Sequence, residues 1–364
     1  MREKYIPINL FNDIWISCYY NNLISILLSN HVKSNFLPAM IKSSYKIRIL
    51  KDEMDKGFKE IHFTLGWLML MKKFTHFGQL DDAFMNKEVK IEDFTNSAES
   101  IKKHIHEGNY VFFPVNRYFL KGGVNYKKDD FFHLALFTGY SDEKKQFQLS
   151  EDCVKPGLQQ IYDLDYEALD QSNHYFKKLN EEKNRTGEFY VINHKSNINQ
   201  IKIPVADIIA EFKNHLLSTS DERELFTDYE GIEVLKLYEE TFYEAMSDVR
   251  QLDNLYFYLS EPIQHIQLRI YLIHFIQSQL NINKMNYLEV FNEIKKKWDQ
   301  YRNIIQLSYI RNPDRQNFQN NLKNKKEVIS TLIEGIYKLE KNVTETLIVE
   351  LDQYKEQFLE LSLN

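Results

Sequence analysis

The residues best able to do chemistry in this chain are a cysteine and a histidine more than a hundred positions apart. Cys18 follows Ser17 at the point where the sequence pattern becomes helical, and a helix N-terminus favours the thiolate, the nucleophilic form of cysteine. His133 lies in an apolar strand pattern and is a candidate base for that thiol. A short strand pattern follows and ends in Glu151 and Asp152, so either carboxylate is a candidate to orient the histidine. This order of residues predicts a thiol-dependent site.

Each of these residues also has an ordinary structural explanation. A single cysteine on an apolar helix is more often a small core residue, and a strand histidine is usually satisfied by its neighbours. Cys153, beside the proposed carboxylate, is better explained as a buried bystander than as a second catalytic thiol. His104 and His106 are two positions apart on a helix, so they do not share a face, and the sequence predicts no metal site.

Composition narrows the function classes. Hydrophobic residues make up 43% of the 364 residues and aromatics 14%, which is typical of a folded protein with sizeable cores. The net charge of −6 gives no general argument for nucleic-acid binding. Two cysteines favour a reducing compartment, and neither a signal peptide nor a membrane span is visible. We therefore expect a soluble, cytoplasmic protein that binds neither nucleic acid nor membrane.

Hydrophobic periodicity divides the chain into a mixed front half and a helical back half. The front half predicts helices and strands joined by a polar hairpin turn at 140–146, and then a connection with a helix at 154–180. The predicted helices cover 18–30, 66–77 and 97–107, and the predicted strands cover 110–116, 131–140, 146–151 and 188–193.

From Pro204 onward the pattern predicts helix throughout, with Gln316 to Lys326 as a solvated loop or an exposed helix face. The predicted helices are 205–217, 229–259, 262–280, 287–307 and 326–361. The expected organisation is an α+β catalytic domain with an antiparallel sheet at 1–200. An all-helical domain at 201–364 is expected to cover its cleft.

Several short motifs in the front half occur together in one known family. They are Cys18 with Asn21-Asn22-Leu, the strand from Val111 to Leu120, the stretch from His133 to Tyr140, and the far side of the hairpin from Phe147 to Asp152. In this order they resemble the N-terminal domain of the butirosin biosynthesis protein H family, which is itself similar to papain-like and peptidase-C39-like folds. The resemblance covers roughly residues 10–195.

This resemblance implies a cysteine acyltransferase. A member of the family moves an acyl group from an acyl carrier protein onto an amine, and relatives accompany nonribosomal peptide and related antibiotic pathways. Cys18 would be the nucleophile, His133 the base and then the acid, and Asp152 the orienting carboxylate. Papain-like enzymes also place an amide side chain about six residues before the cysteine to hold the oxyanion; Asn12 has that spacing here, and Asn9 is an alternative.

The expected reaction needs no cofactor, because the donor acyl group would arrive on the phosphopantetheine arm of an acyl or peptidyl carrier protein. A small-molecule amine would be the acceptor. Two other functions remain open on sequence alone. The same triad fits a hydrolase acting on a peptide, amide or thioester, and a papain-like scaffold with a buried, unreactive Cys18 fits a binding protein.

Overall fold

The computed structural model describes residues 2–30, 41–50, 69–74, 85–91, 97–183, 187–193, 202–224, 226–245, 255–282, 286–311 and 315–360. The chain combines helices with antiparallel sheets, as the sequence predicted, and it forms two compact units. Most of the first unit is Met1–Ser34 and His76–Ile201, and the second is Asn35–Thr75 and Lys202–Glu360. The predicted boundary near residue 200 therefore differs in one respect, because the segment 35–75 belongs to the second unit.

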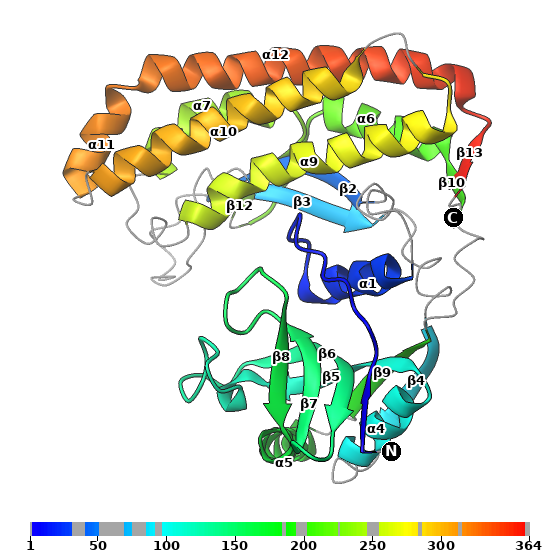
Figure 1. The fold of residues 1–364 in the computed structure, drawn as a ribbon. Coiled ribbons are helices and arrows are strands. Elements are labelled where there is room, and N and C mark those ends of the chain that lie inside the picture. Colours follow the sequence, from blue (N-terminus) through cyan, green and yellow to red (C-terminus); the bar gives the residue numbers. More distant parts are fainter. Residues whose placement is uncertain are drawn as a thin grey trace. The chain divides into compact units, whose positions relative to one another are not determined.

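The first unit contains a seven-stranded antiparallel sheet (Figure 1). Strand β1 (Glu3–Tyr5) pairs with β6 beyond the point where the pairing of β6 with β5 ends. The other strands follow the order β4 (Met85–Ile91), β9 (Gly187–Asn193), β5 (Asn109–Asn116), β6 (Phe132–Ser141), β7 (Gln146–Glu151) and β8 (Gln160–Asp165).

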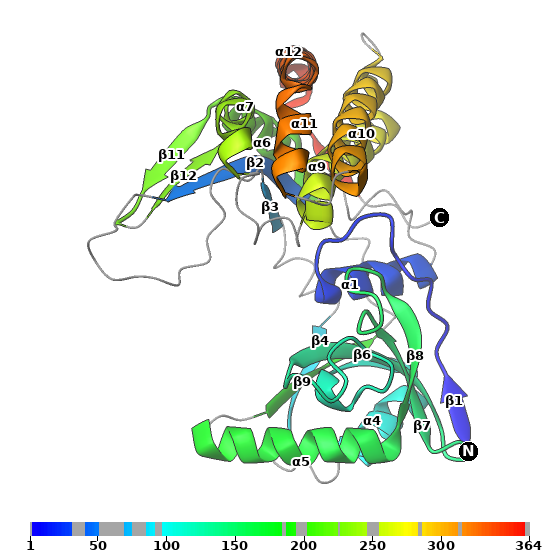
Figure 2. The same cartoon turned by 90° about the vertical axis from the view of Figure 1, so that its left-hand side faces the viewer.

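The described residues of the first unit also form the helices α1 (Cys18–Ser29), α4 (Ser97–His106) and α5 (Tyr166–Lys183). Side chains alternate along β6, so His133 and Phe132 point to opposite faces of the sheet. Phe132 packs against Tyr175 and Phe176 of α5, whereas α1 lies on the other side (Figures 1 and 2). The face that carries His133 is thus the face toward the helix that begins with Cys18.

The second unit places helices on a four-stranded antiparallel sheet (Figure 2). The sheet has the order β11 (Thr219–Glu222), β12 (Phe226–Glu230), β2 (Ile41–Leu50) and β3 (Met69–Phe74), and β10 (Lys202–Pro204) pairs separately with β13 (Phe358–Glu360). The helices in the described part of this unit are α6 (Val205–Leu216), α7 (Val234–Ala245), α9 (Leu255–Gln279), α10 (Tyr287–Arg311), α11 (Arg315–Lys323) and α12 (Lys326–Leu351).

Two predictions for these regions are wrong. Within the helix predicted at 66–77, the described residues form strand β3, which pairs with β2. The back half is not all helical, because β10 to β13 interrupt it and β2 and β3 join it. The pattern from Gln316 to Lys326 gives helix α11, whose Phe318 and Leu322 are buried. Among the described residues, no helix combines the length and apolar character needed to cross a membrane.

Gly139 marks a close approach between β1 and β6. A Cβ atom there would lie 2.4 Å from Tyr5 Cδ1 and 3.0 Å from the carbonyl oxygen of Lys4, which real Cβ contacts do not tolerate without movement. The register of β6 with β7 also shifts between Phe137 and Gly139. Glycine is therefore needed at this position so that β1 can pair.

We predict that Gly139→Ala destabilises the protein by about 1–3 kcal/mol, because the added methyl group overpacks the β1–β6 contact. Gly335→Ala is the matched control. Gly335 lies within α12, where the nearest atoms to an added Cβ are those of the Lys297 side chain at 3.6–3.8 Å. That substitution should stabilise the protein by about 0.5–1 kcal/mol through helix propensity. Urea denaturation of both variants measures the difference, and equal effects would contradict the argument.

Candidate active site

Cys18 is held at the start of α1 by a buried asparagine. Ser17 caps the helix, and its hydroxyl accepts a hydrogen bond from the backbone N–H of Tyr20. The Asn21 side chain accepts from the backbone N–H groups of Ile16 and Ser17 and donates to two carbonyl oxygens further upstream, those of Phe11 and Ile14. All hydrogen-bonding positions of the Asn21 amide are thereby used, and the segment before Cys18 is fixed against its helix.

The thiol of Cys18 lies in a negatively charged environment. Its Sγ is 3.7 Å from Asp152 Oδ1. A ring nitrogen of His133 lies within 4.8 Å of the Cys18 sulfur and of a carboxylate oxygen of Asp152. Burial, followed by the charges of Asp152 and Glu151, raises the pKa of Cys18 to about 12, although Arg117 acts in the opposite direction. The helix N-terminus was expected to favour the thiolate, but these causes outweigh it, and Cys18 is a neutral thiol at neutral pH.

Glu151 is the carboxylate that contacts His133. Its Oε2 lies 2.9 Å from His133 Nδ1, and in the Nδ1–H tautomer the ring donates to this carboxylate. That tautomer leaves Nε2 without a proton. The resemblance predicted that Asp152 would orient His133, but in the structure Glu151 makes this contact.

The strand register explains why Glu151, and not Asp152, contacts His133. Leu136 of β6 pairs with Ser150 of β7, so continuing the register by one residue sets Glu151 opposite Ala135. Ala135 and His133 point to the same face of β6, and Glu151 therefore shares that face. Asp152 comes after the last residue of β7, and its other oxygen, Oδ2, accepts a hydrogen bond of 2.8 Å from the backbone N–H of Gly157. The two adjacent carboxylates thus reach different partners.

Arg117 joins these groups, and the sequence analysis missed it. Its Nη2 donates to Glu151 Oε1 and to Asp152 Oδ1, and it lies 3.1 Å from His133 Nδ1. Burial alone would lower the pKa of Arg117, but the two carboxylates raise it overall, so the guanidinium stays charged. The available signal was a single basic residue directly after the buried strand β5, at the start of a short 3-10 helix, Arg117–Phe119.

Asn12, predicted to help hold the oxyanion, hydrogen-bonds to the backbone of Gln159. Asn12 Nδ2 donates to the carbonyl oxygen of Gln159 at 3.0 Å, and the backbone N–H of Gln159 donates to Asn12 Oδ1 at 2.8 Å. The alternative residue, Asn9, contacts Ser29 and Leu28 at the far end of α1. Gln159 is buried, and its Nε2 lies 3.5 Å from the carbonyl oxygen of Cys18. Asn12 therefore anchors the segment that carries this second amide beside Cys18.

Cys153 is a buried free thiol, and burial raises its pKa to about 12.

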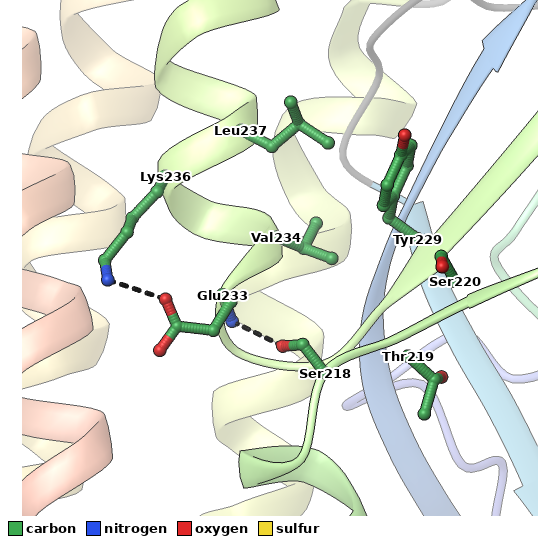
Figure 3. A pocket seen from close by; sticks show the side chains of 8 residues that line it. All are labelled: Ser218, Thr219, Ser220, Tyr229, Glu233, Val234, Lys236 and Leu237. Atoms are coloured by element: carbon green, nitrogen blue, oxygen red, sulfur yellow. Dashed lines mark hydrogen bonds and ion pairs between the residues drawn. The ribbon is translucent and has the colours of Figure 1, made fainter.

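A separate pocket of about 380 Å³ lies in the second unit (Figure 3). At its edge, the Glu233 carboxylate pairs with Lys236 at 2.6 Å, and the backbone N–H of Glu233 donates to the Ser218 hydroxyl. The lining of this pocket combines hydroxyl, aliphatic and paired charged side chains, and Cys18 and His133 are not among them.

Neither protein-family models nor curated protein sequences give a match to this chain. The family resemblance of the front half therefore stays a prediction.

We predict that Asp152→Asn increases the reactivity of Cys18. Asp152 is the nearest negative charge to the thiol, so its removal lowers the pKa of Cys18 from about 12 and increases the thiolate fraction at every pH below that value. A decrease of one pKa unit gives about tenfold faster alkylation by iodoacetamide. Rates are measured between about pH 7 and 10, and peptide mapping separates Cys18 from Cys153.

The control for this experiment is Asp130→Asn. Asp130 accepts hydrogen bonds from Asn116 and Tyr175 in the same unit and is not among the charges that act on the thiol. Its variant should alkylate at the wild-type rate. An unchanged or slower rate for Asp152→Asn would show that this carboxylate does not suppress the thiolate.

Proposed function

We propose that the chain is a cysteine-dependent acyltransferase that moves an acyl group from a carrier-protein thioester onto an amine. The observation that carries the proposal is the meeting of Cys18, His133 and two carboxylates on one face of the first unit. These residues come from a helix start, a strand and a strand end. The choice of acyl transfer, and of a carrier protein and an amine as partners, is supported by the resemblance of the front-half motifs.

In the first half of the reaction, the thiol of Cys18 attacks the carbonyl carbon of the donor thioester while Nε2 of His133 takes the thiol proton. The donor C–S bond breaks as the new C–S bond forms, and the proton passes from His133 to the departing thiol. One thioester replaces another, so this step needs no nucleotide. A resting neutral thiol suits this sequence, because the proton leaves only when an acceptor and a substrate are both in place.

In the second half, the amine attacks the acyl-Cys18 carbonyl. His133 accepts a proton from the attacking nitrogen and returns a proton to the Cys18 sulfur as the C–S bond breaks. Glu151 holds Nδ1–H throughout and stabilises the imidazolium that forms in each half. The products are an amide and the free enzyme thiol.

The experiment that tests the proposal supplies an acyl thioester of a phosphopantetheinylated carrier protein. Intact-protein mass spectrometry should show one acyl addition, which Cys18→Ala should lose because it removes the nucleophile. Adding a panel of amines should then give acyl-amide faster than free acid, since a bound amine has a high effective concentration. Free acid as the sole product with every amine would instead identify a hydrolase.

Glu151→Gln should lower acyl-transfer turnover by about 10³-fold or more, because an amide side chain no longer fixes the Nδ1–H tautomer of His133. The Asp152→Asn variant keeps the contact between Glu151 and His133, so its turnover should fall much less. Turnover with the best donor is the measurement, and a thermal unfolding midpoint for each variant shows that the fold is intact. If Glu151→Gln keeps wild-type turnover, a residue other than Glu151 orients His133.

One observation favours a second candidate function, a binding protein on the same scaffold. Burial raises the pKa of Cys18 from its ordinary value of 9.0 to about 12, which suits a structural thiol as well as a nucleophile awaiting its base. A chain that neither takes up an acyl group nor reacts with iodoacetamide faster than an unactivated thiol would belong to this class.

A further inference from the structure

We propose that His215, His265 and Glu340 bind one divalent transition-metal ion in the core of the second unit. The three side chains come from helices α6, α9 and α12, and all are buried, with at most 2% of any residue exposed. One atom from each, two imidazole nitrogens and a carboxylate oxygen, lies within 4.8 Å of the others. This site is separate from the Cys18 site, and the proposal does not rest on the proposed function.

The spacing of the donor atoms suits a metal ion. Glu340 Oε1 lies 3.0 Å from His215 Nε2 and 2.7 Å from His265 Nε2. Ligands bound at about 2.0–2.1 Å stand roughly 2.8–3.4 Å apart in octahedral or tetrahedral geometry. Movements on the order of half an ångström would therefore admit an ion. Two neutral imidazoles with one carboxylate are a ligand set that suits Zn²⁺ and its neighbours rather than Mg²⁺ or Ca²⁺.

Outer contacts hold two of the ligands as metal ligands are usually held. Ser44 Oγ lies 3.3 Å from His215 Nδ1, so this ring can donate Nδ1–H and present Nε2 unprotonated. Tyr45 donates to the second oxygen of Glu340 at 2.8 Å and itself accepts from Trp298 Nε1 at 3.2 Å. Oε1 of Glu340 is thereby directed at the two imidazoles.

The charge of this core points in the same direction. With neutral imidazoles the cluster carries the negative charge of Glu340, and a buried uncompensated charge is costly. Arg269 of α9 is buried nearby, but it donates to Glu211 and to the carbonyl oxygen of Ser43. The Arg269 charge also acts on His265, and a divalent cation between the three ligands would offset the Glu340 charge directly.

The competing explanation is a plain hydrogen-bond network, in which both imidazoles donate Nε2–H to Glu340 Oε1. Metal content separates the two. The full chain is unfolded, treated with EDTA and refolded with either Zn²⁺, Co²⁺ or EDTA, because a closed core site loads during folding. After removal of free metal, the wild-type protein should retain about one ion per chain. Co²⁺ should give visible absorption bands, and Zn²⁺ should raise the thermal midpoint relative to EDTA.

Glu340→Gln is the decisive variant, since glutamine can still exchange hydrogen bonds with Tyr45 and the imidazoles but is a poor metal ligand. It should retain at least about tenfold less metal, as should His265→Gln. Glu350→Gln is the matched control, because Glu350 is also a buried carboxylate on α12 and accepts from Tyr287. Cys18→Ala is the second control, since Cys18, His133 and Asp152 form another group of possible metal-ligating side chains among the described residues. Both controls should keep the ion.

Two results would overturn the proposal. Folded wild-type protein could hold less than roughly a tenth of an ion per chain, with no Zn²⁺-dependent midpoint. Alternatively, metal could persist in Glu340→Gln and disappear in Cys18→Ala. Either result makes the cluster a hydrogen-bond network. The wild-type comparison stands by itself if a ligand variant does not fold.

Discussion

The site of the first unit depends on one guanidinium placed between two adjacent buried carboxylates. Glu151 and Asp152 are at most 3% exposed, and two like charges this close in a dry environment repel each other. Arg117 contacts both through Nη2 and offsets this repulsion. A buried ion group of this kind contributes little net stability, but removing one member leaves an uncompensated charge. Arg117 therefore acts mainly by offsetting the repulsion between its partners and fixing their position.

The charges around Arg117 also affect reactivity. Burial is the main cause of the raised pKa of Cys18, and the one negative charge in excess, from two anions and one cation, adds to it. The two carboxylates act on different groups, because Glu151 faces the base and Asp152 faces the nucleophile.

Local sequence patterns predicted the elements of the first unit well but not the contacts between them. The helix from Cys18, the helix from Ser97 and the hairpin of β6 and β7 all agree with the structure, because periodicity and turn residues are local signals. The choice between Glu151 and Asp152 required the register of two strands and the last paired residue of β7, which alternation within one strand does not give. Arg117 carried no pattern of its own, because its role arises from residues far along the chain. Strand β3 was predicted as helix since its assignment depends on pairing with β2.

The second unit shows the same limit at greater sequence distance. Glu340 is 75 residues from His265 and 125 from His215, and no spacing rule connects them. Each lies on a helix whose apolar face the sequence does reveal, so each is expected to be buried, and a buried polar group must find a partner. Burial on three converging helices makes a shared cluster the natural solution, since satisfying all three groups together avoids three separate desolvation penalties. Tyr45 extends the cluster from α12 to β2, a strand from the front half of the sequence. The polar cluster thereby ties a strand of the early segment to the late helices.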